Sequence, residues 1–84
     1  MREVSIVIPN YNGKHFLENC LKAVLAQTIE NQEVIVVDNG STDGSLEYLE
    51  TFPGVRVIAL DRNYGFCHAV NKGIQASEGE YVIL

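Results

Sequence analysis

The order of the apolar segments is the feature that most restricts the fold of this chain. Short runs rich in β-branched residues lie at Val4–Pro9, Val34–Val37, Val55–Leu60 and Tyr81–Leu84. They alternate with segments whose apolar residues recur at helical spacing. Strands that alternate with helices in this way predict an α/β fold with a Rossmann-like parallel sheet in the order β-α-β-α-β-α-β. We expect the third run at one edge of the sheet, followed by the second, the first and the fourth.

The boundaries of these elements follow from local signals. Pro9 cannot donate to a sheet ladder and is expected to end the first strand. The apolar run at 34–37 is continuous rather than alternating, which predicts a strand covered on both faces. The first helix is expected over about Lys14–Gln27, and the third helix carries apolar residues on one face from Phe66 to Ile74 and is expected to close at 77–79. The second is expected to carry Leu46, Leu49 and Phe52 on one face, with a cap from one of three polar residues: Ser41, Thr42 or Asp43.

Composition excludes several classes of protein. The formal net charge is −5 and the six basic residues are scattered, so nucleic acid is not an expected partner. No apolar stretch approaches the length of about 20 residues that spans a bilayer, so we expect a cytoplasmic location, at most at the inner face of the membrane in a longer parent protein. Cys20 and Cys67 lack metal-ligand spacing and are expected to be free thiols.

Polar and aromatic residues follow three of the predicted strands, at 9–13, 38–43 and 61–65. The carboxyl ends of parallel strands meet at one edge of a sheet, so these loops are expected to converge there. A tyrosine can cover a planar base, and carboxylates, amides and arginine can bind a ribose or a phosphate. The loops therefore predict a nucleotide pocket, although each alone is also ordinary turn chemistry. Neither GxGxxG nor GxxxxGK[ST] occurs, which disfavours dinucleotide and P-loop sites.

Three sequence motifs carry a resemblance to a known family. They are VSIVIPNYN at 4–12, VVDNGSTDGS at 36–45, and NYG at 63–65 with NKGI at 71–74. Together they resemble the start of family 2 glycosyltransferases, which implies the front half of a GT-A domain. Residues 1–84 are then expected to be its N-terminal part that binds the nucleotide sugar, truncated at the fourth strand. Asparagine at Asn10, Asn12 and Asn39 resembles a rhamnosyltransferase-like branch of the family.

The resemblance also implies roles for individual residues. Pro9 and Tyr11 correspond to residues that shape the base pocket, and Asp38 to a carboxylate that contacts the base or ribose. Asn71 and Gly73 match a helix motif that serves either packing or binding. The expected nucleotide-binding set is Pro9, Tyr11, Asn12, Asp38, Asn63 and Gly65, the last two from a loop that closes over the nucleoside.

The implied reaction is inverting transfer of a sugar from a nucleoside diphosphate sugar to a hydroxyl of a glycan, lipid or protein, as in cell-wall or polysaccharide biosynthesis. The family's Asp-x-Asp motif, which holds Mg²⁺ or Mn²⁺, and its catalytic base are expected beyond Leu84. No catalytic residue, metal ligand or bound cofactor is expected within residues 1–84, so this chain alone should be inactive. A non-catalytic nucleotide-binding or assembly module remains the alternative, and an exposed sheet edge or face suggests a homodimer.

Overall fold

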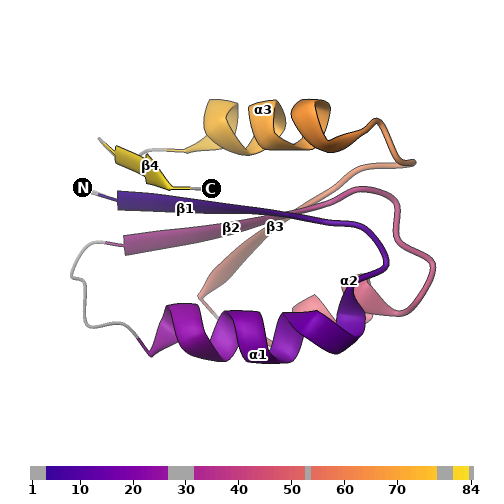
Figure 1. The fold of residues 1–84 in the computed structure, drawn as a ribbon, viewed down its shortest axis with the longest axis horizontal. Coiled ribbons are helices and arrows are strands. Elements are labelled where there is room, and N and C mark those ends of the chain that lie inside the picture. The colour runs from indigo at the N-terminus through magenta and orange to yellow at the C-terminus, as the bar shows by residue number, and fades with distance from the viewer. Residues whose placement is uncertain (1–3, 27–31, 53, 78–80, 84) are drawn as a thin grey trace.

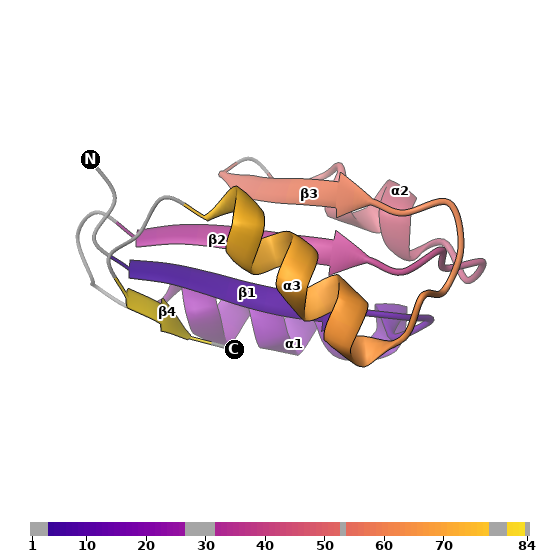
Figure 2. The same cartoon turned by 90° about the horizontal axis from the view of Figure 1, so that it is seen from above.

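A computed structural model describes residues 4–26, 32–52, 54–77 and 81–83 of the chain. Its strands form one four-stranded parallel sheet in the order β3-β2-β1-β4, as Figure 2 shows, which confirms the predicted arrangement. The elements in chain order are β1 (Val4–Asn10), α1 (Lys14–Leu25), β2 (Gln32–Asp38), α2 (Ser45–Leu49), β3 (Val55–Ala59), α3 (Phe66–Ala76) and β4 (Tyr81–Ile83).

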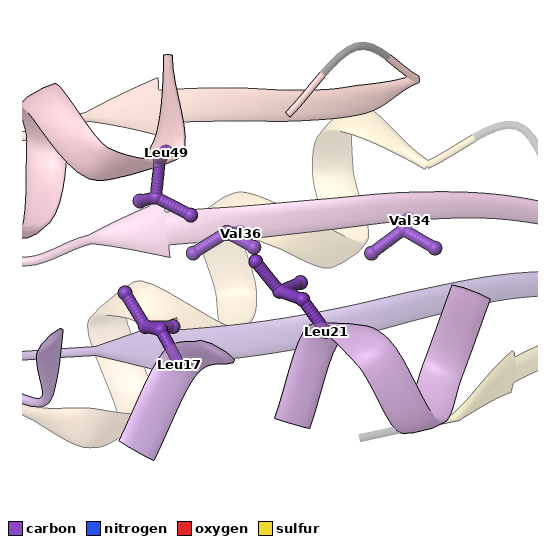
Figure 3. Packing of buried hydrophobic residues seen from close by; sticks show 5 residues of the cluster. All are labelled: Leu17, Leu21, Val34, Val36 and Leu49. Carbon is purple, nitrogen blue, oxygen red and sulfur yellow. The ribbon is translucent and has the colours of Figure 1, made fainter. Parts of the chain in front are cut away.

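The sheet is the middle of three layers, with α3 on one face and α1 and α2 on the other (Figure 1). Successive side chains of a strand point to opposite faces, so the continuous apolar run of β2 serves both. Val34 and Val36 pack with residues of α1 and α2, as Figure 3 shows, namely Leu17, Leu21 and Leu49. Ile35 and Val37 pack with Val7 and Ala69 under α3. The prediction that this strand is covered on both faces is therefore confirmed.

Gly73 allows α3 to lie close against the sheet. A Cβ atom at this position would stand 2.2 Å from Cγ1 of Val7 and 3.2 Å from Cγ2 of Val37. No side chain fits there without displacing the helix or the Val7 side chain, because carbon atoms do not approach so closely. Gly73 is therefore a packing residue, whereas Asn71 on the same helix is exposed.

The first strand runs through Pro9 to Asn10, and the prediction that it ends at the proline is wrong. The carbonyl oxygen of Asn10 accepts a hydrogen bond from the backbone N–H of Asn39 (2.8 Å), so the backbone of Asn10 faces β2 and that of Pro9 faces the other side. On that other side, the described pairing with β4 reaches only Ile6. The missing N–H of Pro9 therefore interrupts no ladder bond between the described residues.

The second helix is shorter than its apolar spacing predicted. It ends at Leu49, and Phe52 lies beyond it, where the N–H of Phe52 donates to the carbonyl of Leu49 (3.1 Å) in a tighter turn. Neither Ser41 nor Thr42 caps it, since Gly44 occupies the N-cap position. The carboxylate of Asp43 accepts from the backbone N–H of Ser45 instead (3.0 Å).

The remaining boundaries agree with the sequence to within a few residues. The first helix ends at Leu25, and the expected end at Gln27 lies outside the described residues, as does Leu84 of the fourth run. Cys20 and Cys67 are free cysteines, as expected. Within the described ranges, no helix has the length and apolarity needed to cross a bilayer.

Candidate functional site

The carboxyl ends of β1, β2 and β3 meet at one edge of the sheet, where the loops at 11–13, 39–44 and 60–65 follow them (Figure 1). Backbone hydrogen bonds continue past the strands. The N–H of Asn39 donates to the carbonyl of Asn10, and the N–H of Leu60 donates to the carbonyl of Asp38, each at 2.8 Å. The first residue of the second loop is therefore anchored to the end of β1, and the first residue of the third loop to the end of β2.

Asp38 ties the first loop to the second. Its side chain is only 2% exposed, and its carboxylate accepts three hydrogen bonds. Oδ1 accepts from Nδ2 of Asn10 (3.0 Å) and from the hydroxyl of Ser41 (2.7 Å), while Oδ2 accepts from the backbone N–H of Ser41 (3.0 Å). These donors offset the cost of burying a charged group. Asp38 therefore acts as a structural bridge in this arrangement.

Ser41 extends this bridge to the tip of the first loop. Its hydroxyl oxygen also accepts from the backbone N–H of Asn12 (2.9 Å), and Oδ1 of Asn12 accepts from the N–H of Thr42 (2.8 Å). Asn12 has a φ of 52°, a left-handed conformation that asparagine tolerates better than most residues. The conformation of the loop that carries Tyr11 thus depends on Ser41.

Asn39 connects the second loop to the third. Its side chain is 4% exposed; Nδ2 donates to the carbonyl of Gly65 (3.1 Å) and Oδ1 accepts from the N–H of Tyr64 (3.0 Å). The neighbouring Gly40 has a φ of 77°, and a Cβ atom there would stand 2.5 Å from Cα of Arg62. Position 40 therefore requires glycine, because the two loops are in backbone contact.

Exposed aromatic rings stand at the rim of these loops. Tyr11 is 51% exposed and Tyr64 is 38% exposed. The Tyr64 ring stacks on His68 with 4.6 Å between centroids, and the guanidinium of Arg62 lies 4.9 Å from its centroid. Its hydroxyl donates to Asp61, which lowers the pKa of that carboxyl group. The rim thus offers rings for stacking and a cation for an anionic ligand.

Two cavities flank the end of β1 and the start of α1. One, of about 290 Å³, contains Pro9 and Tyr11 and does not include Asp38; its lining is Ile8, Pro9, Asn10, Tyr11, Gly13, Phe16, Leu17 and Cys20. The other, of about 350 Å³, lies between α1 and α2 and is lined by Lys14, His15, Glu18, Asp43 and Tyr48. The two residues assigned to the base pocket therefore share one cavity.

Comparison with known proteins then identifies the family. The sequence pattern of glycosyl transferase family 2 matches residues 5–84. The chain belongs to this family. The glycosyltransferase GlyG of Streptococcus pneumoniae is 39% identical over 85 residues, an alignment that covers 96% of this chain and 28% of GlyG. Family 2 membership and the parallel α/β sheet agree with what the motifs predicted.

Two solved structures show the same fold. A mannosyltransferase from Pyrobaculum calidifontis, in complex with GDP-Man and Mn²⁺, superposes with a TM-score of 0.85 at 30% identity, over 98% of this chain and 26% of that one. TarS of S. aureus in complex with UDP gives a TM-score of 0.88 at 29% identity, over 95% and 25%. The chain thus spans about a quarter of the length of these two proteins and has the fold of GT-A glycosyltransferases.

The described residues of this family 2 chain do not form a metal site. No group of three or more histidine, cysteine, aspartate or glutamate side chains among them could hold an ion. The carboxylates near the sheet edge are already bonded to protein donors: Asp38 to Asn10 and Ser41, Asp43 to Ser45, and Asp61 to Tyr64. The divalent cation that the family resemblance implies therefore finds no ligand set in this part of the chain.

The predicted site residues fall into two groups. Pro9, Tyr11 and Asn12 lie on the first loop or at its start, and Asn63 and Gly65 lie on the third, where Oδ1 of Asn63 accepts from the N–H of Gly65 (2.8 Å). Asp38 lies between them, buried, and its contact with a nucleoside stays a prediction. Sequence reasoning missed the connecting roles of Asn10, Asn39 and Ser41. The adjacent polar pair at 38 and 39, at the end of a buried strand, was the signal for them.

Asp43 leads to a prediction about pH. Its carboxylate accepts from the N–H of Lys14 (3.0 Å) at the start of α1, and from the N–H and hydroxyl of Ser45 at the start of α2. The Ser45 hydroxyl, followed by the Lys14 backbone, lowers the pKa of Asp43. A lowered carboxyl pKa stabilises the fold above the unfolded-state pKa, and this contribution is lost as the pH falls through the folded-state value.

We therefore expect Asp43→Asn to lower the melting temperature at neutral pH. The difference from wild type should shrink as the pH falls below about 4, because the wild-type carboxylate is then protonated too. Thermal unfolding followed by circular dichroism at several pH values measures this. Glu47→Gln removes an exposed carboxylate from α2 and is the charge control. Equal pH dependence in both variants would show that Asp43 contributes only general charge.

Proposed function

We propose that residues 1–84 form the nucleoside-binding half of an inverting glycosyltransferase, which transfers a sugar from a nucleoside diphosphate sugar to an acceptor hydroxyl. The observation that carries this proposal is the convergence of three loops at the carboxyl edge of the sheet, joined by Asp38, Asn39 and Ser41. Ligands of open α/β sheets bind beyond this edge. Such an arrangement suits a ligand that needs several fixed contacts in a small space.

The two solved structures with this fold support a nucleotide ligand, since one contains GDP-Man and the other UDP. In the proposed complex, Tyr11 offers its half-exposed ring to the base above the cavity that it shares with Pro9. Asn12, Asn63 and Gly65 border the ribose from the two outer loops. Asp38 holds the first loop in place, and in this proposal its carboxylate contacts the base or ribose.

Inverting transfer requires the acceptor oxygen to attack the anomeric carbon opposite the departing diphosphate. A base must remove the proton of the hydroxyl, and a cation must offset the charge that develops on the diphosphate. We assign neither task to residues 1–84, whose part is to bind and orient the nucleoside. In this proposal the base and the Asp-x-Asp ligands of Mg²⁺ or Mn²⁺ lie outside residues 1–84. The proposal also includes a glycan, lipid or protein acceptor, a cytoplasmic location and a homodimer.

Nucleotide titration tests the proposal. We expect UDP or dTDP to bind weakly, with a Kd on the order of millimolar, about −4 kcal/mol, because base and ribose contacts are present without a cation on the diphosphate. Nuclear magnetic resonance should show shifts at Tyr11, Asn12, Asn63 and Gly65. Added Mg²⁺ should change the affinity little.

Two results would contradict this assignment: shifts confined to residues far from Tyr11, or binding that depends strongly on Mg²⁺. GDP is titrated in parallel, and its affinity relative to UDP and dTDP shows which base the site prefers. Sugar transfer by a longer protein that contains this chain separates an enzyme from the non-catalytic module that the sequence alone left open.

A further inference from the structure

We propose that Asn39 is a positioning residue: it holds the segment Asn63–Gly65 at the edge of the nucleoside site, and this requires a neutral amide at position 39. The inference rests on the proposed function, because it specifies how one side of that site is kept in place. Asn39 is not among the residues assigned to contact the nucleotide. It acts through the backbone of its neighbours.

The hydrogen bonds of Asn39 match its two polar atoms. Nδ2 donates to the carbonyl of Gly65 (3.1 Å), while Oδ1 accepts from the N–H of Tyr64 (3.0 Å). One planar amide group is therefore hydrogen-bonded to a donor and to an acceptor on consecutive residues of the third loop. At 4% exposure the amide has little access to water, so these partners satisfy it.

The third loop has few other links to the rest of the site. The residues from Asp61 to His68 are all exposed. Among the described residues, the side-chain hydrogen bonds that reach the segment Asn63–Gly65 from the first two loops both come from Asn39. The other two side-chain bonds, from Tyr64 to Asp61 and from Gly65 to Asn63, are internal to the loop. The backbone contact of Gly40 with Arg62 and the bond from Leu60 to Asp38 hold the start of the loop. The side-chain links of the segment Asn63–Gly65 to the second loop depend on the buried amide of Asn39.

An aspartate at this position would have the same shape and the wrong polarity. An ionised carboxylate only accepts hydrogen bonds, so it would place an oxygen against the carbonyl oxygen of Gly65 and lose that bond. Burial and the adjacent carboxylate of Asp38 both disfavour the ionised form. A protonated carboxyl group can donate again. The isosteric substitution should therefore release the loop when the new group is ionised and restore it at lower pH.

Other groups near position 39 also carry or change charge. Arg62 and Asp61 belong to the loop itself, His68 lies on α3 next to the Tyr64 ring, and Asp38 precedes Asn39 on β2. Every measurement is therefore expressed as a difference from wild type at the same pH.

The experiment compares wild type, Asn39→Asp, Asn39→Ala and Asn19→Asp by amide spectra and nucleotide titration at about pH 7.5 and about pH 5. Asn19 is exposed on α1, so Asn19→Asp adds the same charge away from the site. We expect shifted or broadened Tyr64 and Gly65 amides in Asn39→Asp at the higher pH, with affinity lower by about tenfold. Both should return toward wild type at the lower pH. Asn39→Ala should be impaired at both values, and Asn19→Asp at neither.

Amide signals of β1 and β2 show whether each variant is folded, and the side-chain amide protons of wild-type Asn39 should exchange slowly with solvent. If the amide signals of Tyr64 and Gly65 in Asn39→Asp match those of wild type at the higher pH, the inference is overturned. Fast exchange of the Asn39 side-chain amide protons with solvent would also overturn it. Loss of binding in this variant without recovery at lower pH would also overturn it, since a donor would then not be what is missing. If wild type binds no nucleotide, the proposed function fails, while the loop amides still decide whether Asn39 positions the loop.

Discussion

Asp38→Ala is expected to abolish nucleotide binding and to lower the free energy of unfolding by about 3 kcal/mol. The substitution leaves three donors without their acceptor: Nδ2 of Asn10, and the N–H and hydroxyl of Ser41. Asp38 is 2% exposed, so water cannot simply replace the carboxylate. Because Ser41 also holds Asn12, the loop with Tyr11 should lose its conformation as well.

Asp38→Asn refines this expectation. It keeps the size of the side chain, and one oxygen can still accept from Asn10 and from the Ser41 hydroxyl. The other position becomes an NH₂ group facing the backbone N–H of Ser41, where two donors meet. We expect a smaller loss of stability than in Asp38→Ala, about 1 to 2 kcal/mol, with weakened binding.

Urea unfolding measures the change in the free energy of unfolding, and titration with UDP measures the change in affinity for the nucleotide. Ser41→Ala separates a contact made by Asp38 from an effect transmitted through the loops, because it removes the hydroxyl bonds and leaves the carboxylate in place. If Ser41→Ala binds UDP as wild type does while Asp38→Ala does not, the loss of binding is not transmitted through the Ser41 hydroxyl. Glu50→Ala removes an exposed carboxylate at the end of α2 and should change neither property.

Much of the fold could be predicted because the apolar pattern determines it locally. Four apolar residues in succession at 34–37 require cover on both faces of a strand, and Leu17 and Leu49 provide one of these covers. Boundaries were less accurate because they depend on tertiary contacts. Pro9 ends a strand only if its missing N–H faces a partner, and which side it faces cannot be read from the sequence.

The site was predicted at the level of loops rather than of contacts. Parallel strands bring 9–13, 38–43 and 61–65 to one edge whatever their side chains do. The partner of each polar side chain depends on how far the strand extends, and β2 extends to Asp38. Asp38 bonds toward the first loop and Asn39 toward the third, as expected where successive side chains alternate in direction. Two adjacent polar residues at the end of a buried strand thus form hydrogen bonds with different loops.

Gly73→Ala should lower the free energy of unfolding by about 2 kcal/mol, which is typical of overpacking in a core. The added Cβ atom would stand 2.2 Å from Cγ1 of Val7, so α3 must move away from the sheet or the valine must change rotamer. Val7 is fully buried and packs among Ile35, Val37 and Ala69, which leaves it no free space. Since α3 follows directly after Gly65, its displacement should also disturb the third loop.

A double-mutant cycle identifies the cause. Val7→Ala removes the methyl group that the new Cβ would meet, and alone it costs stability through the cavity that it leaves. In the Val7→Ala background, Gly73→Ala should cost much less than about 2 kcal/mol, because the added methyl group then occupies part of that cavity. Lys72→Ala, an exposed change in the same turn of α3, controls for helix propensity. Additive losses for Val7→Ala and Gly73→Ala would mean that the close approach of α3 to β1 does not determine this position.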